Sequence, residues 1–381
     1  MIVERVKCLL VLVFSVFFLS FSANTYAQQH KVETDHVEEV HAEGIKNSGE
    51  NKFDAQKVIF GHVLDAHEFH FFSYKGKDGK EHHATIPLPV ILYSPQKGLS
   101  VFSSSRFEHG HASYDGYKLS GNNIVPVDKN VKVYDLSLTR NVVQMFIALA
   151  LLVLIMSSIA KKYRTGKGVT TAPSGFQNAI EPVITFVRDE VARPNLGPTY
   201  RKYMPYLLTV FFFILINNIL GLIPGAANVT GNIAFTMILG VISFIVILIS
   251  SNKHFWGHIF NPPVPMGVKP ILVLVEFLSI FTKPFSLIIR LFANMLAGHI
   301  IIICLISLIF IFGGLSRGVG WGFSPISISF TVFIYFIEIL VAFLQAYIFT
   351  NLTAVFIGQS MEGSHHNGND GHKAPAEPVI I

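Results

Sequence analysis

The sequence contains few charged residues and almost no cysteine. Asp, Glu, Lys and Arg make up only 14% of its 381 residues, and Cys8 and Cys304 are its only cysteines. Two cysteines without a common oxidising compartment exclude a disulfide framework and a cysteine-based metal site. The formal net charge of +5 is spread beside apolar segments rather than gathered in one patch, which argues against a nucleic-acid partner. No cofactor and no metal are expected.

Apolar residues dominate what is present. Hydrophobic residues account for 51% of the chain, and Phe alone occurs 34 times. Together with several long apolar runs, this composition predicts an all-α polytopic membrane protein with its membrane domain over 136–360. We expect five membrane helices, at about 140–160, 204–223, 232–251, 271–312 and 325–357. A surface helix with basic flanks is expected at about 176–191.

The fourth apolar segment is too long to stand upright in a bilayer. As a continuous helix, its 42 residues from 271 to 312 would span about 63 Å, against a hydrocarbon core of about 30 Å. Splitting it near Lys283 and Pro284 would add a membrane crossing and place the C-terminal tail outside the cell. We therefore predict that the last two membrane helices are long, kinked and strongly tilted.

The region before the membrane domain reads as an exported segment. Residues 1–27 have the basic start, apolar run and small-residue end of a signal peptide; an uncleaved anchor is the alternative. Residues 28–135 are polar and predict a small β-rich extracytoplasmic domain, with strands at 58–70, 90–93 and 124–133 and turns at 77–79 and 120–122. The tail, 361–381, is expected to be disordered.

Histidines are concentrated in the front domain. The spacing of His62, His67, His70, His82 and His83 forms no tight zinc-ligand motif. Solvated surface histidines are therefore expected there rather than a metal site.

Basic residues predict the orientation in the membrane. The loops after the first and third spans hold ten Lys and Arg, whereas the other two loops hold only Arg317. The positive-inside rule then puts the front domain outside and the tail in the cytoplasm. Export of the front domain requires the same orientation.

Arg290 is the residue that composition does not explain. It lies within an apolar run, has no acidic residue within one or two helical turns, and cannot lose its proton. A charge at the bilayer centre costs about 2.5–3.5 kcal/mol on insertion scales, so such residues usually face a protein partner or water. The alternative is an arginine that snorkels to the membrane surface.

The helix around Arg290 has two polar faces. Ala293, Asn294 and Ala297 follow Arg290 at helical spacing and form a stripe of small residues that permits close helix packing. His299 lies nine residues after Arg290, which places it about 180° away and roughly 13 Å further along the helix.

The last apolar segment carries Glu338 and Gln345, seven residues apart and on nearly the same face. The Gly-rich stretch 313–322 between the two segments predicts a loop. In an antiparallel hairpin turning near residue 318, Arg290 lies at the depth of Gln345 and His299 at the depth of Glu338. The sequence thus places amide beside guanidinium and carboxylate beside imidazole.

These motifs resemble those of a known family. The stretch KPFSLIIRLFANMLAGH, the preceding Glu276, and IEILVAFLQAYIF are similar to the last two membrane helices of the a subunit of F-type ATP synthases, over about 134–360. The resemblance implies a non-catalytic subunit of the bacterial inner membrane, partnered by the c-subunit ring, the b subunits of the peripheral stalk and lipid. Many bacterial relatives carry the acid and the histidine at His299 and Glu338 in exchanged positions, which suggests one shared proton-handling role.

The resemblance implies a proton path through two offset half-channels. His299 and Glu338 would line the outer half-channel, Glu276 would stand at the cytoplasmic mouth, and Arg290 would separate the two. A purely structural His299–Glu338 pair and an interfacial role for Glu276 are the alternatives.

Further polar residues are expected around the arginine. Asn294, Gln345 and Ser286 would orient its guanidinium, unless the two amides only join helices. Four more residues would line the outer half-channel or pack between the second and third spans: Asn217, Asn218, Asn232 and Thr236.

Two other function classes fit less well. A secondary transporter or channel with an intramembrane Arg site would be expected to show internal repeats with paired broken helices, and the sequence has none. An anchored extracytoplasmic sensor would leave Arg290, His299 and Glu338 unexplained. The sequence leaves open whether H⁺ or Na⁺ is carried and how large the ring is.

Overall fold

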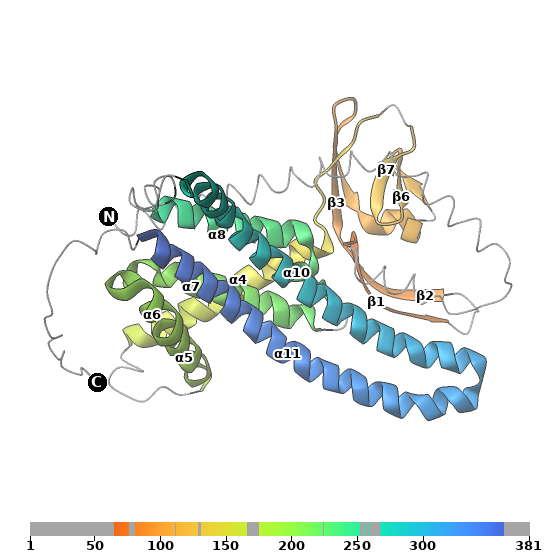
Figure 1. The fold of residues 1–381 in the computed structure, drawn as a ribbon. Coiled ribbons are helices and arrows are strands. Elements are labelled where there is room, and N and C mark those ends of the chain that lie inside the picture. Colours follow the sequence, from red (N-terminus) through yellow and green to blue (C-terminus); the bar gives the residue numbers. More distant parts are fainter. Residues whose placement is uncertain are drawn as a thin grey trace, which may run out of the picture.

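The computed structural model describes residues 65–75, 81–110, 112–128, 131–165, 175–223, 225–251, 255, 259 and 267–361. The predicted signal peptide lies outside these residues, as does the predicted tail after Met361. A small β-rich front domain stands beside a body of long helices, as the sequence predicts (Figure 1).

The front domain contains three small antiparallel sheets with the orders β1-β2, β4-β3-β8 and β5-β6-β7. A 3₁₀ segment, η3 (Ser104–Gly110), follows β4. The strands are β1 (Glu68–Lys75), β2 (Glu81–Pro87), β3 (Pro89–Ser94), β4 (Gly98–Ser103), β5 (Ser113–Tyr114), β6 (Tyr117–Ser120), β7 (Asn123–Pro126) and β8 (Tyr134–Asp135).

Alternating burial along β3 builds the core of the front domain. Val90 and Leu92 are fully buried and pack with Phe107, Tyr117 and Ile124. Strands are confirmed within each of the three predicted segments, although the part of the first before residue 65 lies outside the described residues. Gly121, with a φ of 59°, makes the predicted turn between β6 and β7.

His67 joins the front domain to the segment that enters the membrane. Its Nε2 lies 2.9 Å from Asp135 Oδ2, and the imidazole is buried. The expectation of a solvated histidine is therefore wrong for His67, because a carboxylate on β8 allows the ring to be buried. The connection continues into the first membrane helix, where the Arg140 backbone N–H donates to the Ala66 carbonyl at 2.9 Å.

Within the part of the chain that the structure describes, five helices are long and apolar enough to cross a membrane. The long helices are α4 (Arg140–Arg164), α7 (Tyr200–Gly221), α8 (Ile233–Ser250), α10 (Lys269–Leu315) and α11 (Arg317–Met361). The segments that lead into α7 are α5 (Phe176–Phe186), the π-helical turn η4 (Val187–Ala192), α6 (Arg193–Leu196) and the 3₁₀ turn η5 (Gly197–Thr199). The 3₁₀ turn η6 (Val229–Gly231) precedes α8.

α10 and α11 form one long antiparallel hairpin whose tip extends beyond the other helices (Figure 1). α10 is a single helix that continues through Pro284, so the undivided reading of this segment is confirmed. The predicted loop over 313–322 is wrong in its extent, because only Ser316 leaves the helical conformation. A Cβ built at Gly320 would lie 2.7 Å from Gly313 Cα, so these glycines let the two helices approach closely.

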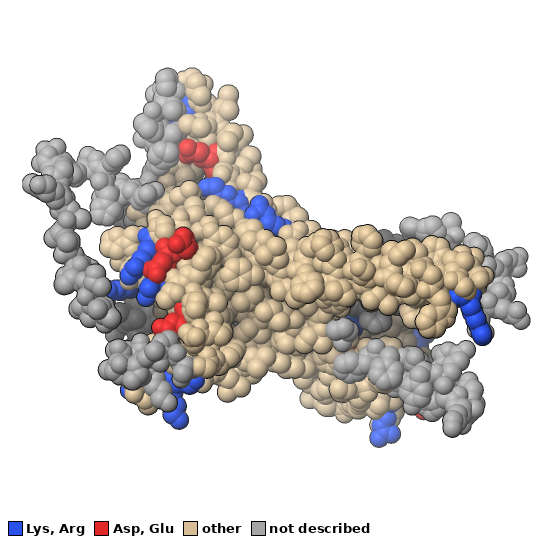
Figure 2. Space-filling view, turned by 90° about the horizontal axis from the view of Figure 1, so that it is seen from below, with Lys and Arg blue, Asp and Glu red and all other residues tan. Residues whose placement is uncertain are grey.

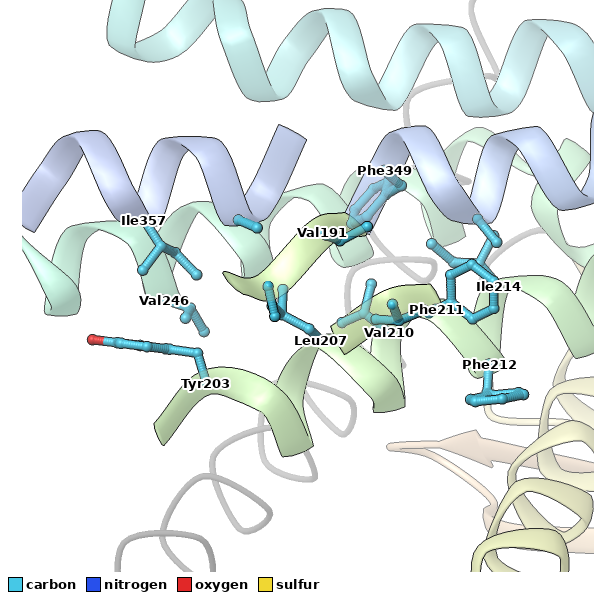
Figure 3. Close-up of a cluster of buried hydrophobic side chains, with 14 of the residues drawn as sticks. Val191, Tyr203, Leu207, Val210, Phe211, Phe212, Ile214, Val246, Phe349 and Ile357 are labelled. Carbon is cyan, nitrogen blue, oxygen red and sulfur yellow. The ribbon is translucent and has the colours of Figure 1, made fainter. Parts of the chain in front are cut away.

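The apolar core of the membrane domain centres on α7. Leu207, Phe211 and Ile214 of α7 are fully buried, and residues of η4, α8, α10 and α11 pack around them (Figure 3). Gly240 of α8 lets α10 approach, because a Cβ there would lie 2.2 Å from Ile288. The ends of α10 and α11 nearest their shared turn lie outside this core.

Charged side chains avoid most of the hairpin. Figure 2 shows them gathered toward one end of the displayed face, whereas the projecting arm is uncharged until close to its tip. Lys161, Lys162 and Arg164 close α4, and Lys269 opens α10. This distribution suits a helical body embedded in a bilayer.

The His67–Asp135 pair should make the front domain's attachment depend on pH. Burial disfavours the charged form of each residue, but their hydrogen bond and mutual attraction outweigh it, raising the pKa of His67 above 6.5 and lowering that of Asp135 below 3.8. The stabilisation from His67 is therefore complete below pH 6.5 and is lost as pH rises through its raised pKa. The stabilisation from Asp135 is present above pH 3.8 and is lost as pH falls through the lowered pKa of Asp135.

Hydrogen exchange of the Arg140 amide, which bonds to the Ala66 carbonyl, measures this attachment. After correction for intrinsic rates, protection should be greater at pH 5.5 than at pH 9. Asp135→Asn should remove the difference. Equal protection at both pH values in the unaltered chain would contradict the assignment.

Candidate functional site

Glu338 is buried inside the α10–α11 hairpin, against the backbone of α10. Its exposed fraction is 6%. A Cβ built at Gly298 would lie 1.8 Å from Glu338 Oε1, so the carboxyl group occupies the space that the glycine leaves. His299 follows directly and is half-buried. The structure therefore places the acid and the histidine at one level of the hairpin, as the spacing predicts, and adds Gly298, which the sequence analysis did not single out.

Gln345 fixes the level of Arg290. Its Nε2 donates to the Arg290 backbone carbonyl at 2.8 Å, and the Gln345 side chain is buried. We expected this amide to orient the guanidinium, but its observed partner is the carbonyl. A carbonyl oxygen has two lone pairs, so it can accept this bond as well as its own helical one. The predicted pairing in depth holds, while the side chain of Arg290 is left for another partner.

The Arg290 side of α10 faces away from the rest of the chain. Arg290, Ala293, Asn294 and Ala297 are all exposed, whereas Leu291 and Met295 between them are buried. Among the described residues, no carboxylate forms an ion pair with the guanidinium. Ser286, one turn earlier, is also exposed. Small residues of this kind permit the close approach of another helix, and cations within a membrane usually face a protein partner or water.

Glu276 lies on the same side of α10, fourteen residues before Arg290 and about 21 Å along the helix. It is half-buried. Lys283 lies midway between them and was not singled out from the sequence. Its spacing of seven residues from both Glu276 and Arg290 would have placed it on the same face of the helix. Its Nζ lies 3.3 Å from Gln359 Oε1 and 5.0 Å from the centre of the Phe356 ring.

Two asparagines connect neighbouring elements to the hairpin near Glu338. Asn218 of α7 donates to the Ala342 carbonyl at 3.2 Å, one turn after Glu338. Asn228, before η6, donates to the Met295 carbonyl at 2.9 Å, one turn before His299. This contact of Asn228 leaves no signal in the sequence, because a residue in a short loop shows no periodic pattern.

Three buried oxygens in this region accept no hydrogen bond from any described residue. They are Asn217 Oδ1, Asn218 Oδ1 and Thr230 Oγ1, and all three residues are fully buried. The other two sequence candidates stabilise the start of α8 instead: Asn232 caps it at the Ala234 N–H, and the Thr236 hydroxyl bonds back to the Asn232 and Ile233 carbonyls. Buried acceptors without protein donors are costly and are commonly satisfied by water.

Comparison with known proteins identifies the family. A family model described as "ATP synthase A chain" matches residues 142–358. ATP synthase subunit a of Chlorobium phaeobacteroides (strain BS1) is 35% identical over 371 residues, which cover 93% of each chain. The chain belongs to the ATP synthase subunit a family. Membership places this a subunit in the membrane sector of an F-type ATP synthase.

Other relatives are more similar in sequence over a shorter stretch of the chain. ATP synthase subunit a of Chloroherpeton thalassium is 45% identical over 243 residues, 63% of this chain and 71% of that protein. The Myxococcus xanthus protein of the same name is 40% identical over 248 residues, 63% of this chain and 78% of its own length. The front domain of the a subunit matches a separate model, described as a domain of unknown function, over residues 58–144.

Replacing Gly298 with alanine tests the close packing of Glu338 in the a subunit. The new Cβ requires the carboxyl group or α11 to move, and overpacking of this kind costs about 1–3 kcal/mol. We expect reduced ATP-driven proton pumping by membranes with a normal content of the subunit. Gly314→Ala is the matched control, because a Cβ there meets nothing within 4 Å. Unchanged pumping in Gly298→Ala would show that the carboxyl position is unimportant.

Proposed function

We propose that this a subunit conducts protons between the two sides of the membrane through two offset half-channels that meet at Arg290. Protons pass to and from a carboxylate on each c subunit of a rotating ring, which couples their flow to ATP synthesis. The observation that carries the proposal is the outward-facing Arg290, without an ion-pair partner among the described residues, beside the small side chains of Ala293 and Ala297. A ring helix bearing a carboxylate has the charge and shape for this surface.

The outer half-channel contains His299 and Glu338. An imidazole and a carboxylate can both exchange protons near neutral pH. The unsatisfied oxygens of Asn217, Asn218 and Thr230 support water in this region, because each can accept a hydrogen bond from it. A proton entering from outside would pass from this water to the His299–Glu338 level and then to the ring.

The inner half-channel runs past Glu276. A ring carboxylate that has lost its proton is attracted to Arg290, and the fixed positive charge also keeps protons from crossing directly between the half-channels. Asn294 and Ser286, exposed on the same side, are candidates to orient the guanidinium or its partner. Gln345 acts one step back, by holding the Arg290 backbone.

The chain's surroundings follow from the same proposal. It is a non-catalytic subunit of the bacterial inner membrane, with the front domain outside and the C-terminal tail in the cytoplasm. Basic residues concentrated at the cytoplasmic ends of the helices support this orientation. Its partners are the c ring, the b subunits of the peripheral stalk and membrane lipid.

Arg290→Ala tests the central step. Without the fixed cation, a deprotonated ring carboxylate has no partner in the membrane and protons can leak between the half-channels. Proton-driven ATP synthesis should fall to background, while ATP hydrolysis by the soluble head continues. The measurement is ATP synthesis in membrane vesicles with an imposed proton gradient, matched for a-subunit content. Retention of coupled synthesis would refute the role.

Exchanging the acid and the histidine tests whether the two positions share one task. The double variant His299→Glu with Glu338→His keeps one carboxylate and one imidazole at the same level of the hairpin. It should retain at least several-fold more synthesis than either single variant, measured in the same vesicles. A double variant no better than the worse single one would rule out a shared relay.

A further inference from the structure

Gln144 of α4 makes two hydrogen bonds with one residue of the loop between α7 and α8. Its Nε2 donates to the Ala227 carbonyl at 2.5 Å, and its Oε1 accepts from the Ala227 N–H at 2.7 Å. The Gln144 side chain is 4% exposed and Ala227 is fully buried. One side chain therefore satisfies both polar groups of a buried backbone residue, which fixes the position of that residue in two directions.

The residue after this pair continues the connection into α10. Asn228 donates from Nδ2 to the Met295 carbonyl at 2.9 Å and accepts at Oδ1 from the Gly231 N–H at 2.9 Å. Little space surrounds its amide, since a Cβ at Gly231 would lie 2.5 Å from Nδ2 and one at Gly221 would lie 3.7 Å from Oδ1. Asn228 therefore has few alternative positions if the loop shifts.

Thr230 belongs to the same short loop, and its hydroxyl is one of the three unsatisfied buried oxygens. The loop thus touches α10 one turn before His299 and also supplies an acceptor to the region assigned to outer water. Its position depends on α4, a helix that carries none of the residues proposed to transfer protons.

We infer that Gln144 is a positioning residue for the outer half-channel: its amide holds the Ala227–Asn228 segment in place and thereby sets the access of protons to Glu338. This inference rests on the proposed function and deepens it. The titratable groups concerned are Glu338 on α11 and His299 on α10, while Arg140 stands one turn before Gln144 on α4. Gln144 itself does not titrate, so any effect acts through the geometry of the path.

The test is ATP synthesis by membrane vesicles containing the whole complex. Synthesis is measured while the pH on the side of the front domain (outer pH) is varied, with the pH on the cytoplasmic side (inner pH) and the membrane potential held fixed. Gln144→Leu keeps nearly the same volume but leaves the Ala227 N–H and C=O without their partner. We expect half-maximal synthesis to require about threefold to tenfold more outer protons. The dependence on inner pH should not change.

Gln144→Asn keeps the amide on a shorter side chain. It should shift the outer pH profile in the same direction but by less, and it carries the test if the leucine variant does not accumulate. Ser243→Ala is the control for general loosening of the bundle, because it removes the partly buried 3.0 Å bond to Tyr206 between α7 and α8. This control should leave both pH profiles unchanged.

The outcomes separate this inference from the proposed function. An unchanged outer pH profile in assembled Gln144 variants would overturn the positioning role, and so would equal shifts in the outer and inner profiles. Arg290→Ala is assayed in the same vesicles. If it retained coupled synthesis, the proposed function itself would fail, whereas loss of synthesis there with no shift in the Gln144 variants would refute only the positioning role.

Discussion

The register between α10 and α11 is the constraint on which the site depends. A displacement of one residue turns a helical side chain by about 100°, so a small slip would move a buried group onto the surface. Four contacts along the hairpin hold this register: Gly320 against Gly313, the Ser327 hydroxyl on the Leu305 carbonyl, Glu338 against Gly298, and Gln345 on the Arg290 carbonyl. Together they keep the carboxylate inside the hairpin and the guanidinium outside it.

Four polar side chains of the membrane domain donate to backbone carbonyls of other segments. Gln345, Asn218 and Asn228 each donate to the carbonyl of a different segment, and Gln144 does the same to Ala227. The amide nitrogens of Asn217 and Asn218 each donate to a backbone carbonyl, whereas their Oδ1 atoms accept no hydrogen bond from any described residue. The Thr230 hydroxyl is a third buried oxygen without a partner among the described residues. Water donates to such oxygens, so the excess of acceptors favours a hydrated path.

Sequence periodicity was sufficient to predict the hairpin and the depth of its polar groups. Arg290 and Gln345 lie at nearly equal distances in sequence from the turn, and so do His299 and Glu338. Antiparallel packing therefore places each pair at a common depth in the hairpin. The Gly-rich stretch at the turn misled the prediction, because glycine marks close helix packing as well as loops. The hydrogen-bond partner of Gln345 could not be predicted from the sequence either, since a backbone carbonyl leaves no sequence pattern. The same holds for Gln144 and Asn228, whose partners are carbonyls more than 60 residues away.

The exposure of Arg290 has a consequence for how the subunit works. A cation facing hydrocarbon costs about 2.5–3.5 kcal/mol on insertion scales, and its neighbours Ala293 and Ala297 are too small to shield it. Gln345 holds the backbone at this level and leaves the guanidinium available, so the chain fixes the position of the charge without neutralising it. Under the proposed function, the neutralising carboxylate comes from a partner helix, which the small residues allow to approach. Because that carboxylate would also have to leave in the proposed cycle, a permanent ion-pair partner within this chain would be incompatible with it.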